Sequence, residues 1–138
     1  MPIYSGELRL KTAGDGDTID LTEGVQRIVR SSEARHGTAS VFVEGSTAAI
    51  TTMEFESGGV ADLRATLGRL VPVTGDYAHN RLNHDTNSHA HIRAAIVGPS
   101  EAIPFKDGML RLGIWQQIVL VDFDDSPRER TVVVTVTS

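Results

Sequence analysis

Residues 131–137 read Thr-Val-Val-Val-Thr-Val-Thr, and residues 115–123 read Trp-Gln-Gln-Ile-Val-Leu-Val-Asp-Phe. β-Branched side chains are enriched in strands, so both stretches predict β-strands. The turn-forming segment Asp124–Arg128 separates them and favours an antiparallel arrangement. Strands this long and apolar leave edges that proteins tend to pair or cover, which favours self-association unless they pack entirely within one subunit.

The chain before these strands alternates between strand and helix patterns. The hydrophobic periodicity predicts strands over 3–12, 18–21, 38–44, 48–55, 101–105 and 109–112, and helices over 23–35, 60–70 and 88–97. Residues 73–87 form the longest irregular stretch, and long loops in compact domains are often functional. The sequence therefore predicts one α+β domain over residues 1–138, with mixed, largely antiparallel sheets or a sandwich and about three helices.

Local signals refine two of these elements. Thr22 is placed to cap the first helix, and Gly37 is placed to end it. Lys106-Asp107-Gly108 is a hairpin turn signal between the strands over 101–105 and 109–112.

Composition excludes several classes of protein. The chain has 138 residues, no cysteine, a formal net charge of −5 and a pI near 5.4. It therefore has no disulfide framework and no thiolate metal site, and its acidity argues against nucleic-acid binding. We expect no signal peptide and no membrane segment, and hence a cytoplasmic protein.

Four of the five histidines, His79, His84, His89 and His91, lie within 13 residues. Imidazole is the commonest biological metal ligand, and the nearby Asp85 could complete a site for a divalent metal such as zinc. The alternative is a solvated polar loop whose histidines are merely hydrophilic. If the segment from residue 88 is a regular helix, His89 and His91 point about 200° apart and cannot both bind one ion.

Other candidates carry weaker signals. Glu54 could act as a general base or support a metal ligand, or it could simply face solvent. The Gly45-Ser46-Thr47 turn could offer donors to an anion. Arg128 and Arg130 could bind a phosphate, but pairing with Asp124 and Asp125 at the surface is favoured. Trp115 is the only tryptophan, and we expect it at the start of a strand in the core or an interface.

Seven segments, taken in order along nearly the whole chain, resemble the YjbQ-like family, whose members are known as secondary thiamine-phosphate synthase enzymes. They are Ser46-Thr47-Ala48-Ala49-Ile50-Thr51-Thr52-Met53-Glu54, Arg69-Leu70-Val71-Pro72, Tyr77-Ala78-His79-Asn80, Ser88-His89-Ala90-His91-Ile92, Gly98-Pro99-Ser100, Ile103-Pro104-Phe105 and Leu112-Gly113-Ile114-Trp115-Gln116-Gln117-Ile118. The resemblance implies a homotrimer with a histidine-rich metal or anion pocket near the subunit contacts. It also implies a weak thiamine-phosphate-forming activity.

The family pattern transfers to this chain only in part. Glu54, His79, His91 and Thr47 match the family's motifs. Many relatives have histidine at the position of Gly45, so we hypothesise that His84 or His89 replaces that ligand here. Ile114 also departs from the family, which usually has threonine there.

Three functions remain open at this point. The first is a thiamine-phosphate synthase-like transferase acting on a small phosphate-bearing ligand, with Glu54, Thr47 and Asp85 as catalytic candidates and the four histidines as metal ligands. The second is a non-catalytic homotrimer that binds a metal or small molecule. The third is a metal-assisted hydrolase. Only Arg81 and Arg93 lie near the histidines in sequence, which weakens the case for a dedicated diphosphate clamp.

Overall fold

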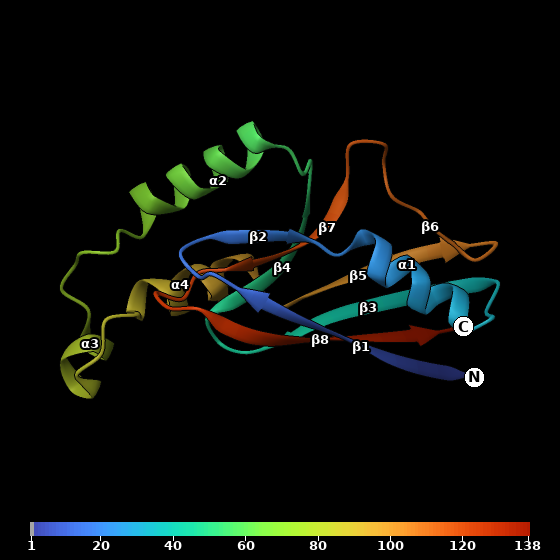
Figure 1. The fold of residues 1–138 in the computed structure, drawn as a ribbon, viewed down its shortest axis with the longest axis horizontal. Coiled ribbons are helices and arrows are strands. Elements are labelled where there is room, and N and C mark those ends of the chain that lie inside the picture. The colour runs from blue at the N-terminus through green and yellow to red at the C-terminus, as the bar shows by residue number, and fades with distance from the viewer. Residues whose placement is uncertain (1) are drawn as a thin grey trace.

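Strands dominate the architecture of residues 2–138, which a computed structural model describes (Figure 1). The strands are β1 (Ile3–Thr12), β2 (Asp17–Asp20), β3 (His36–Glu44), β4 (Ala48–Met53), β5 (Ser100–Lys106), β6 (Met109–Leu110), β7 (Gln117–Asp122) and β8 (Arg128–Thr137). The helices are α1 (Thr22–Ser31), α2 (Ser57–Leu70), α3 (Ala78–Asn83) and α4 (Ser88–Val97). None of these helices is both long enough and apolar enough to cross a membrane.

The strands form two sheets whose neighbouring strands are all antiparallel. The larger sheet has the order β1-β8-β3-β5-β6, and the smaller has the order β2-β7-β4. The predicted α+β class with largely antiparallel sheets is confirmed. Because β8 lies between β1 and β3, the last strand of the chain joins the first strand to the rest of the larger sheet.

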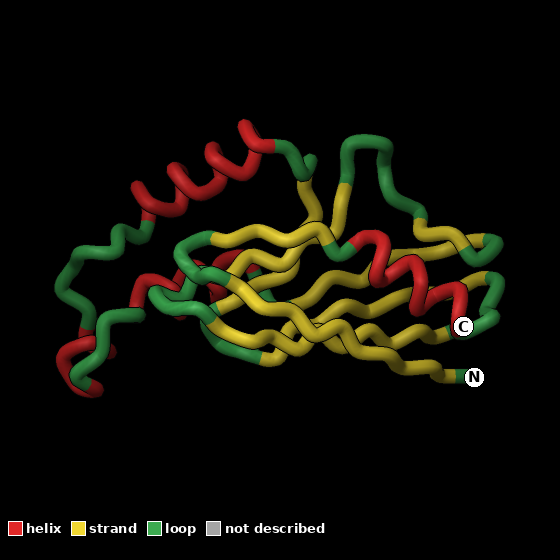
Figure 2. The backbone as a smooth tube through the Cα atoms, viewed as in Figure 1, coloured by secondary structure: helices red, strands yellow, loops and turns green. Residues whose placement is uncertain are grey.

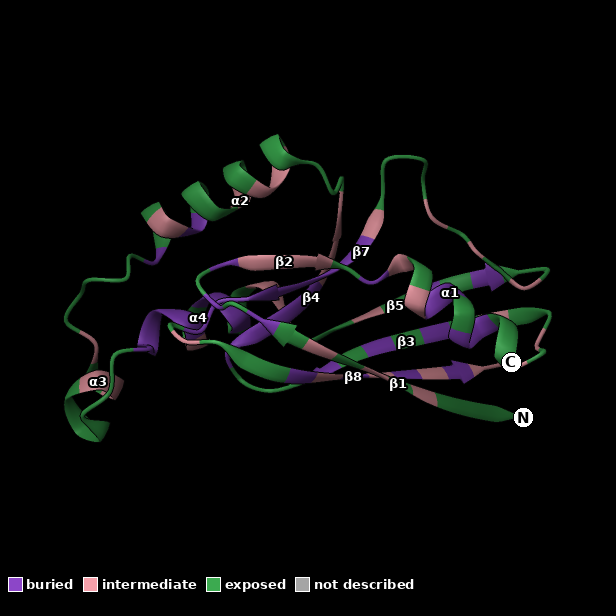
Figure 3. Cartoon of the chain, in the orientation of Figure 1, coloured by how far each residue is buried: buried purple, intermediate pink, exposed green. Residues whose placement is uncertain are grey.

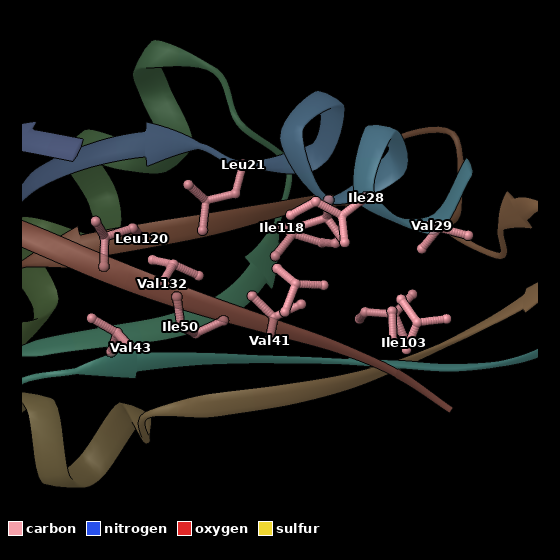
Figure 4. Close-up of a cluster of buried hydrophobic side chains, with 14 of the residues drawn as sticks. Leu21, Ile28, Val29, Val41, Val43, Ile50, Ile103, Ile118, Leu120 and Val132 are labelled. Carbon is pink, nitrogen blue, oxygen red and sulfur yellow. The ribbon is translucent and has the colours of Figure 1, made fainter. Parts of the chain in front are cut away.

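The middle strand of the smaller sheet, β7, is buried on both faces. Ile118 and Leu120 face a core that the larger sheet, the smaller sheet and α1 enclose (Figure 4). Val119 and Val121 face a second core, between the smaller sheet and α2 and α4. An unbroken apolar run is the expected pattern for a strand with both faces buried.

The two cores arrange the molecule in three layers (Figures 2 and 3). The larger sheet is the first layer, α1 and the smaller sheet form the second, and α2 and α4 cover the far side of β7. On α4 the covering side chains are Ala90 and Ala94, whereas α2 contributes the buried Leu67. The small side chains let α4 approach the sheet closely, which places its histidines beside the strand ends.

The first helix differs from its predicted bounds. α1 ends at Ser31 because Glu33 adopts a left-handed conformation with φ of 60°, and Gly37 lies in β3. Thr22 does not cap the helix through its side chain. Its hydroxyl accepts a hydrogen bond from the backbone N–H of Ile118 at 3.0 Å and so joins α1 to β7.

The later helices also differ from the prediction. α2 starts at Ser57, earlier than residue 60, because the Glu56 carboxylate accepts hydrogen bonds from the backbone N–H groups of Gly58 and Gly59. α3 lies inside the stretch expected to be irregular, which brings the helices in residues 2–138 to four. None of its residues is buried, so it has no apolar face that a periodicity could reveal. Trp115 is 72% exposed in the loop before β7 and does not enter the core.

The predicted β5–β6 hairpin is confirmed. Phe105 pairs with Leu110 and Lys106 with Met109, across the two-residue turn of Asp107 and Gly108. Both turn residues have positive φ, 53° and 75°, as a type I′ turn requires.

Burying β7 on both faces predicts an uneven response to leucine truncation. Leu120 is fully buried, whereas Leu82 on α3 is 80% exposed. We expect Leu120→Ala to lower the free energy of unfolding by about 2–5 kcal/mol because it leaves a cavity. Leu82→Ala is the matched control and should change it by less than about 0.5 kcal/mol in urea titrations. Equal losses in the two variants would contradict the burial of the face of β7 that carries Leu120.

Candidate functional site

Two carboxylates lie where β7 ends. Asp122 is the last residue of β7 and Asp124 follows two positions later, and both are fully buried or nearly so. Arg130 of β8 binds Asp122 through two hydrogen bonds, Nε to Oδ2 at 2.7 Å and Nη2 to Oδ1 at 2.9 Å. The hydroxyl of Thr12 donates to the same carboxylate at 2.5 Å. A buried charge needs such partners because its desolvation is costly.

The second carboxylate is held in a similar way. Asp124 accepts hydrogen bonds from the Thr47 hydroxyl at 3.0 Å and from Arg128 Nε at 2.8 Å. Burial alone would raise the pKa of Asp124. The hydrogen bonds from Thr47, Arg128 and the backbone of Asp125, with the charge of Arg128, outweigh burial and lower the pKa to about 2.

The pKa of Asp122 is also lowered, for similar reasons. Burial acts to raise it, but the hydrogen bonds from Arg130 and Thr12 and the charge of Arg130 leave it below its usual value. Both carboxylates are therefore ionised at neutral pH, and each holds one arginine of β8 in a fixed position. The sequence predicts that Arg128 and Arg130 pair with Asp124 and Asp125 at the surface. Arg130 instead forms its ion pair in the interior, and its partner is Asp122.

Thr47, one of the predicted catalytic residues, belongs to this buried network. Its hydroxyl donates to Asp124 and accepts a hydrogen bond from Arg130 Nη2 at 2.6 Å. Because these contacts occupy the hydroxyl, Thr47 orients the arginine. Glu54, in contrast, is exposed just after β4, and its carboxylate accepts no hydrogen bond from another residue of the 2–138 range.

Two of the predicted histidines lie together. The rings of His79 in α3 and His91 in α4 have centroids 4.7 Å apart and an interplanar angle of 55°. His79 Nε2 lies 3.2 Å from Asn87 Oδ1, and His79 Nδ1 lies 3.4 Å from Asn83 Nδ2. The third neighbour is Asp85, whose Oδ2 is 3.9 Å from His79 Nε2. Both ring nitrogens of His79 are thus engaged.

The other two histidines are separate from this pair. His84 is exposed with φ of 54°, at the end of α3. His89 is buried on the regular helix α4, and its Nδ1 is the single fully buried side-chain nitrogen or oxygen in residues 2–138 that lacks a hydrogen-bond partner. Burial, followed by the charge of Arg93, lowers the pKa of His89, and nearby aspartates offset this only in part.

The proposed metal ligands do not fit an ion within one chain. Across residues 2–138, no three side chains among histidine, aspartate and glutamate converge as ligands would. Neither His84 nor His89 joins His91 in such a group, so the idea that one of them replaces a ligand at Gly45 finds no support. Metal binding by the four histidines remains a prediction.

A cleft opens beside His91. Its polar part, about 380 Å³, is lined by Arg128, Arg130 and Asp124 from the end of β7 and the start of β8, and by Asn87 and His91 at the start of α4. Its apolar part, about 330 Å³, is lined chiefly by small side chains, Ala48, Ala94, Ala95 and Pro99. Gly45, Ser46 and His91 line both parts, so the two parts adjoin at these three residues.

The two arginines that lie near the histidines in sequence, Arg81 and Arg93, do not line the cleft. Arg93 is buried and donates to the backbone carbonyl of Val71 at 2.7 and 3.0 Å, and Arg81 pairs with Asp76. The arginines that line the cleft come from β8, almost 40 residues after His91. In the sequence, Arg128 and Arg130 stand two residues apart after an acidic turn. This spacing predicts only that their side chains lie on the same face of a strand, and it does not predict which residues they meet.

The buried carboxylates predict a loss of stability in acid. A lowered folded-state pKa gives stability that is present above the unfolded pKa of about 4 and is lost as pH falls toward about 2. We expect wild type to lose about 2 kcal/mol over this interval through Asp124. Asp124→Asn should be less stable than wild type at pH 7 but flatter between pH 4 and 2 in urea titrations. Asp62→Asn, on the exposed face of α2, should keep the wild-type slope. Because Asp122 retains its own contribution, the outcome that would contradict the assignment is a slope in Asp124→Asn as steep as that of wild type.

Similarity to known proteins covers nearly the whole chain. The profile of the UPF0047 protein YjbQ-like family matches residues 6–138. A UPF0047 protein of Archaeoglobus fulgidus is 40% identical over 128 residues, which cover 93% of this chain and 97% of the relative. A UPF0047 protein of Methanothermobacter thermautotrophicus is 38% identical, and the match covers 99% of this chain and 93% of that one.

Solved structures agree with the sequence matches. A YbjQ-like protein of unknown function from Sulfolobus solfataricus superimposes with a TM-score of 0.93 at 32% identity, covering 98% of this chain and 96% of that chain. A YjbQ/UPF0047 family protein of Clostridium acetobutylicum gives a TM-score of 0.87 at 37% identity, covering 96% and 99%. On sequence and fold together, the chain belongs to the YjbQ-like UPF0047 family.

Proposed function

We propose that the chain is an enzyme that acts on a small phosphate-bearing molecule in the His91 cleft, as a secondary thiamine-phosphate synthase-like transferase. The observation that carries this proposal is that a polar cavity with two arginines adjoins an apolar cavity at Gly45, Ser46 and His91. Small-molecule sites are typically concave and largely apolar, with a few convergent polar groups. The two adjoining cavities together have this character.

The reaction would need little covalent chemistry from the protein. A thiazole ring nitrogen attacks the methylene carbon of a pyrimidine diphosphate. A C–N bond forms, the C–O bond to the diphosphate breaks, and the diphosphate leaves with the electron pair. Catalysis then depends on positioning the two rings and on stabilising the negative charge that develops on the leaving group.

The residues of the cleft suit these two tasks. The half-exposed guanidinium of Arg128 and the ring of His91 are donors for a departing diphosphate. The side chains of Ala48, Ala94 and Pro99 offer an apolar surface for a ring. Asp85 and Asn87 would orient His79, which packs against His91.

Removing the His91 ring tests the proposal. We expect His91→Ala to lower the rate of pyrophosphate release from the two substrates by at least about 100-fold, the usual scale for losing a hydrogen-bond donor that stabilises developing negative charge. His36→Ala is the control, because His36 is an exposed histidine at the start of β3 and should leave the rate unchanged. A wild-type rate in His91→Ala would contradict the assignment. Wild type that binds both substrates without releasing pyrophosphate would identify a small-ligand-binding protein instead.

We also propose that the chain assembles as a homotrimer and that the β6–β7 loop lies in a subunit contact. Ile114 and Trp115 on this loop are 86% and 72% exposed. Adjacent large apolar side chains on a surface are typical of interaction sites. A contact at this loop would bury both of them.

The single tryptophan gives a direct test of this contact. We expect Trp115 emission to be blue-shifted in concentrated protein and to shift to the red on dilution, together with a fall in mass by sedimentation. Ile114→Ala should shift the assembly toward monomer, whereas Leu82→Ala, at a similarly exposed position on α3, should not. A monomer at all concentrations, with red-shifted emission throughout, would contradict the proposal.

A further inference from the structure

We propose that Arg130 is a preformed receptor for an oxyanion, with the Nη1 edge of its guanidinium presented to the polar cavity through a gap left by Gly45. The ligand group it would take is a phosphate. The inference rests on the proposed function in one respect, which is that the ligand lies in the His91 cleft. It adds that the ligand carries a phosphate and that Arg130 binds this phosphate.

The first support is the fixed position of Arg130. Its side chain is only 8% exposed, although it lines the cavity. Nε and Nη2 donate to the two oxygens of Asp122, and Nη2 also donates to Thr47. An arginine on the surface would lose rotamer freedom on binding an anion, whereas this guanidinium is already immobilised. Preorganisation of this kind increases affinity by removing the cost of ordering.

The second support is the remaining nitrogen. Nη1 has no hydrogen-bond partner among residues 2–138, while every other polar group of this side chain is engaged. Nη1 is not fully buried, so it is open to the cavity and can donate to a ligand that enters there. Arginine donors match phosphate oxygens in geometry, so an oxyanion is the chemical complement of this edge.

The third support is Gly45 itself. A Cβ at this position would lie 2.6 Å from Arg130 Nη1, closer than any side chain can approach without displacing the guanidinium. Gly45 also has φ of 145°, a conformation that other residues rarely adopt. The glycine thus keeps the Nη1 edge open.

The charges around the cavity define how the anion is recognised. Arg128 and Arg130 are balanced by Asp124 and Glu129, which line the same cavity. Recognition therefore depends on directed N–H donors from Arg130, and from the half-exposed Arg128, rather than on an excess of positive charge. The adjoining cavity is apolar, so the rest of the ligand would lie against Ala94, Ala95 and Pro99.

Calorimetric titration with inorganic phosphate and with pyrophosphate tests the receptor. We expect both anions to bind the wild-type protein and Gly45→Ala to bind them at least about tenfold more weakly, because the new methyl group displaces Nη1. Gly108→Ala is the matched control. Gly108 also has a positive φ, 75°, but a Cβ there meets no atom within 4 Å. It should reproduce the backbone strain, measured as a lower melting temperature, and keep wild-type affinity.

A second variant keeps the test decisive if Gly45→Ala does not fold. Arg130→Lys retains a positive charge beside Asp122 but has no second nitrogen to direct into the cavity, so we expect the same loss of affinity. Wild-type affinity in a folded Gly45→Ala or Arg130→Lys protein would overturn the inference, as would failure of wild type to bind either anion. If wild type binds phosphate through Arg130 but forms no thiamine phosphate, the receptor stands and the transferase proposal falls. If product forms and Gly45→Ala binds phosphate normally, the receptor alone falls.

Discussion

The double burial of β7 is the constraint on which the rest of the structure depends. A strand that is apolar on both faces must be covered twice, and the chain supplies the larger sheet with α1 on one side and α2 with α4 on the other. The apolar run stops at Asp122, still inside the protein. The end of β7 therefore requires cations, and β8, the next strand of the chain, provides them.

This requirement explains why a binding cleft lies where it does. Asp122 and Asp124 hold two arginines that would otherwise move freely in solvent, and Thr47, the residue before β4, connects the two pairs. α4 packs against the smaller sheet through Ala90 and Ala94, and His91, on the adjacent edge of the helix, lines the polar cavity. Ion pairs that neutralise the strand end thus also position the donors of the cleft. Stability in acid and affinity for an anion should accordingly depend on the same side chains.

The sequence predicted the elements better than it predicted the site. The bounds of β1 and β5 were predicted closely because strand patterns and glycine turns are local signals, whereas β6 ends at Leu110, two residues before its predicted end. α3 was missed because a helix without a buried face has no periodicity. The four histidines are close in sequence, which favoured a shared metal site. The regular helix α4 directs His89 and His91 to different sides, and the ring nitrogens of His79 are within hydrogen-bonding distance of two asparagines. The arginines of the cleft come from a distant strand, and only tertiary packing shows that they belong there.

The position of β8 between β1 and β3 has a consequence for how the chain folds. The pairings of β1 with β8 join residues more than 110 positions apart, and contacts at such separations slow folding. While the ribosome still holds the segment that becomes β8, β1 has no partner strand and β3 has only β5. The larger sheet therefore closes late, after synthesis of nearly the whole domain. Until then two unpaired strand edges are open to aggregation, so the nascent chain should depend on rapid release or on a chaperone.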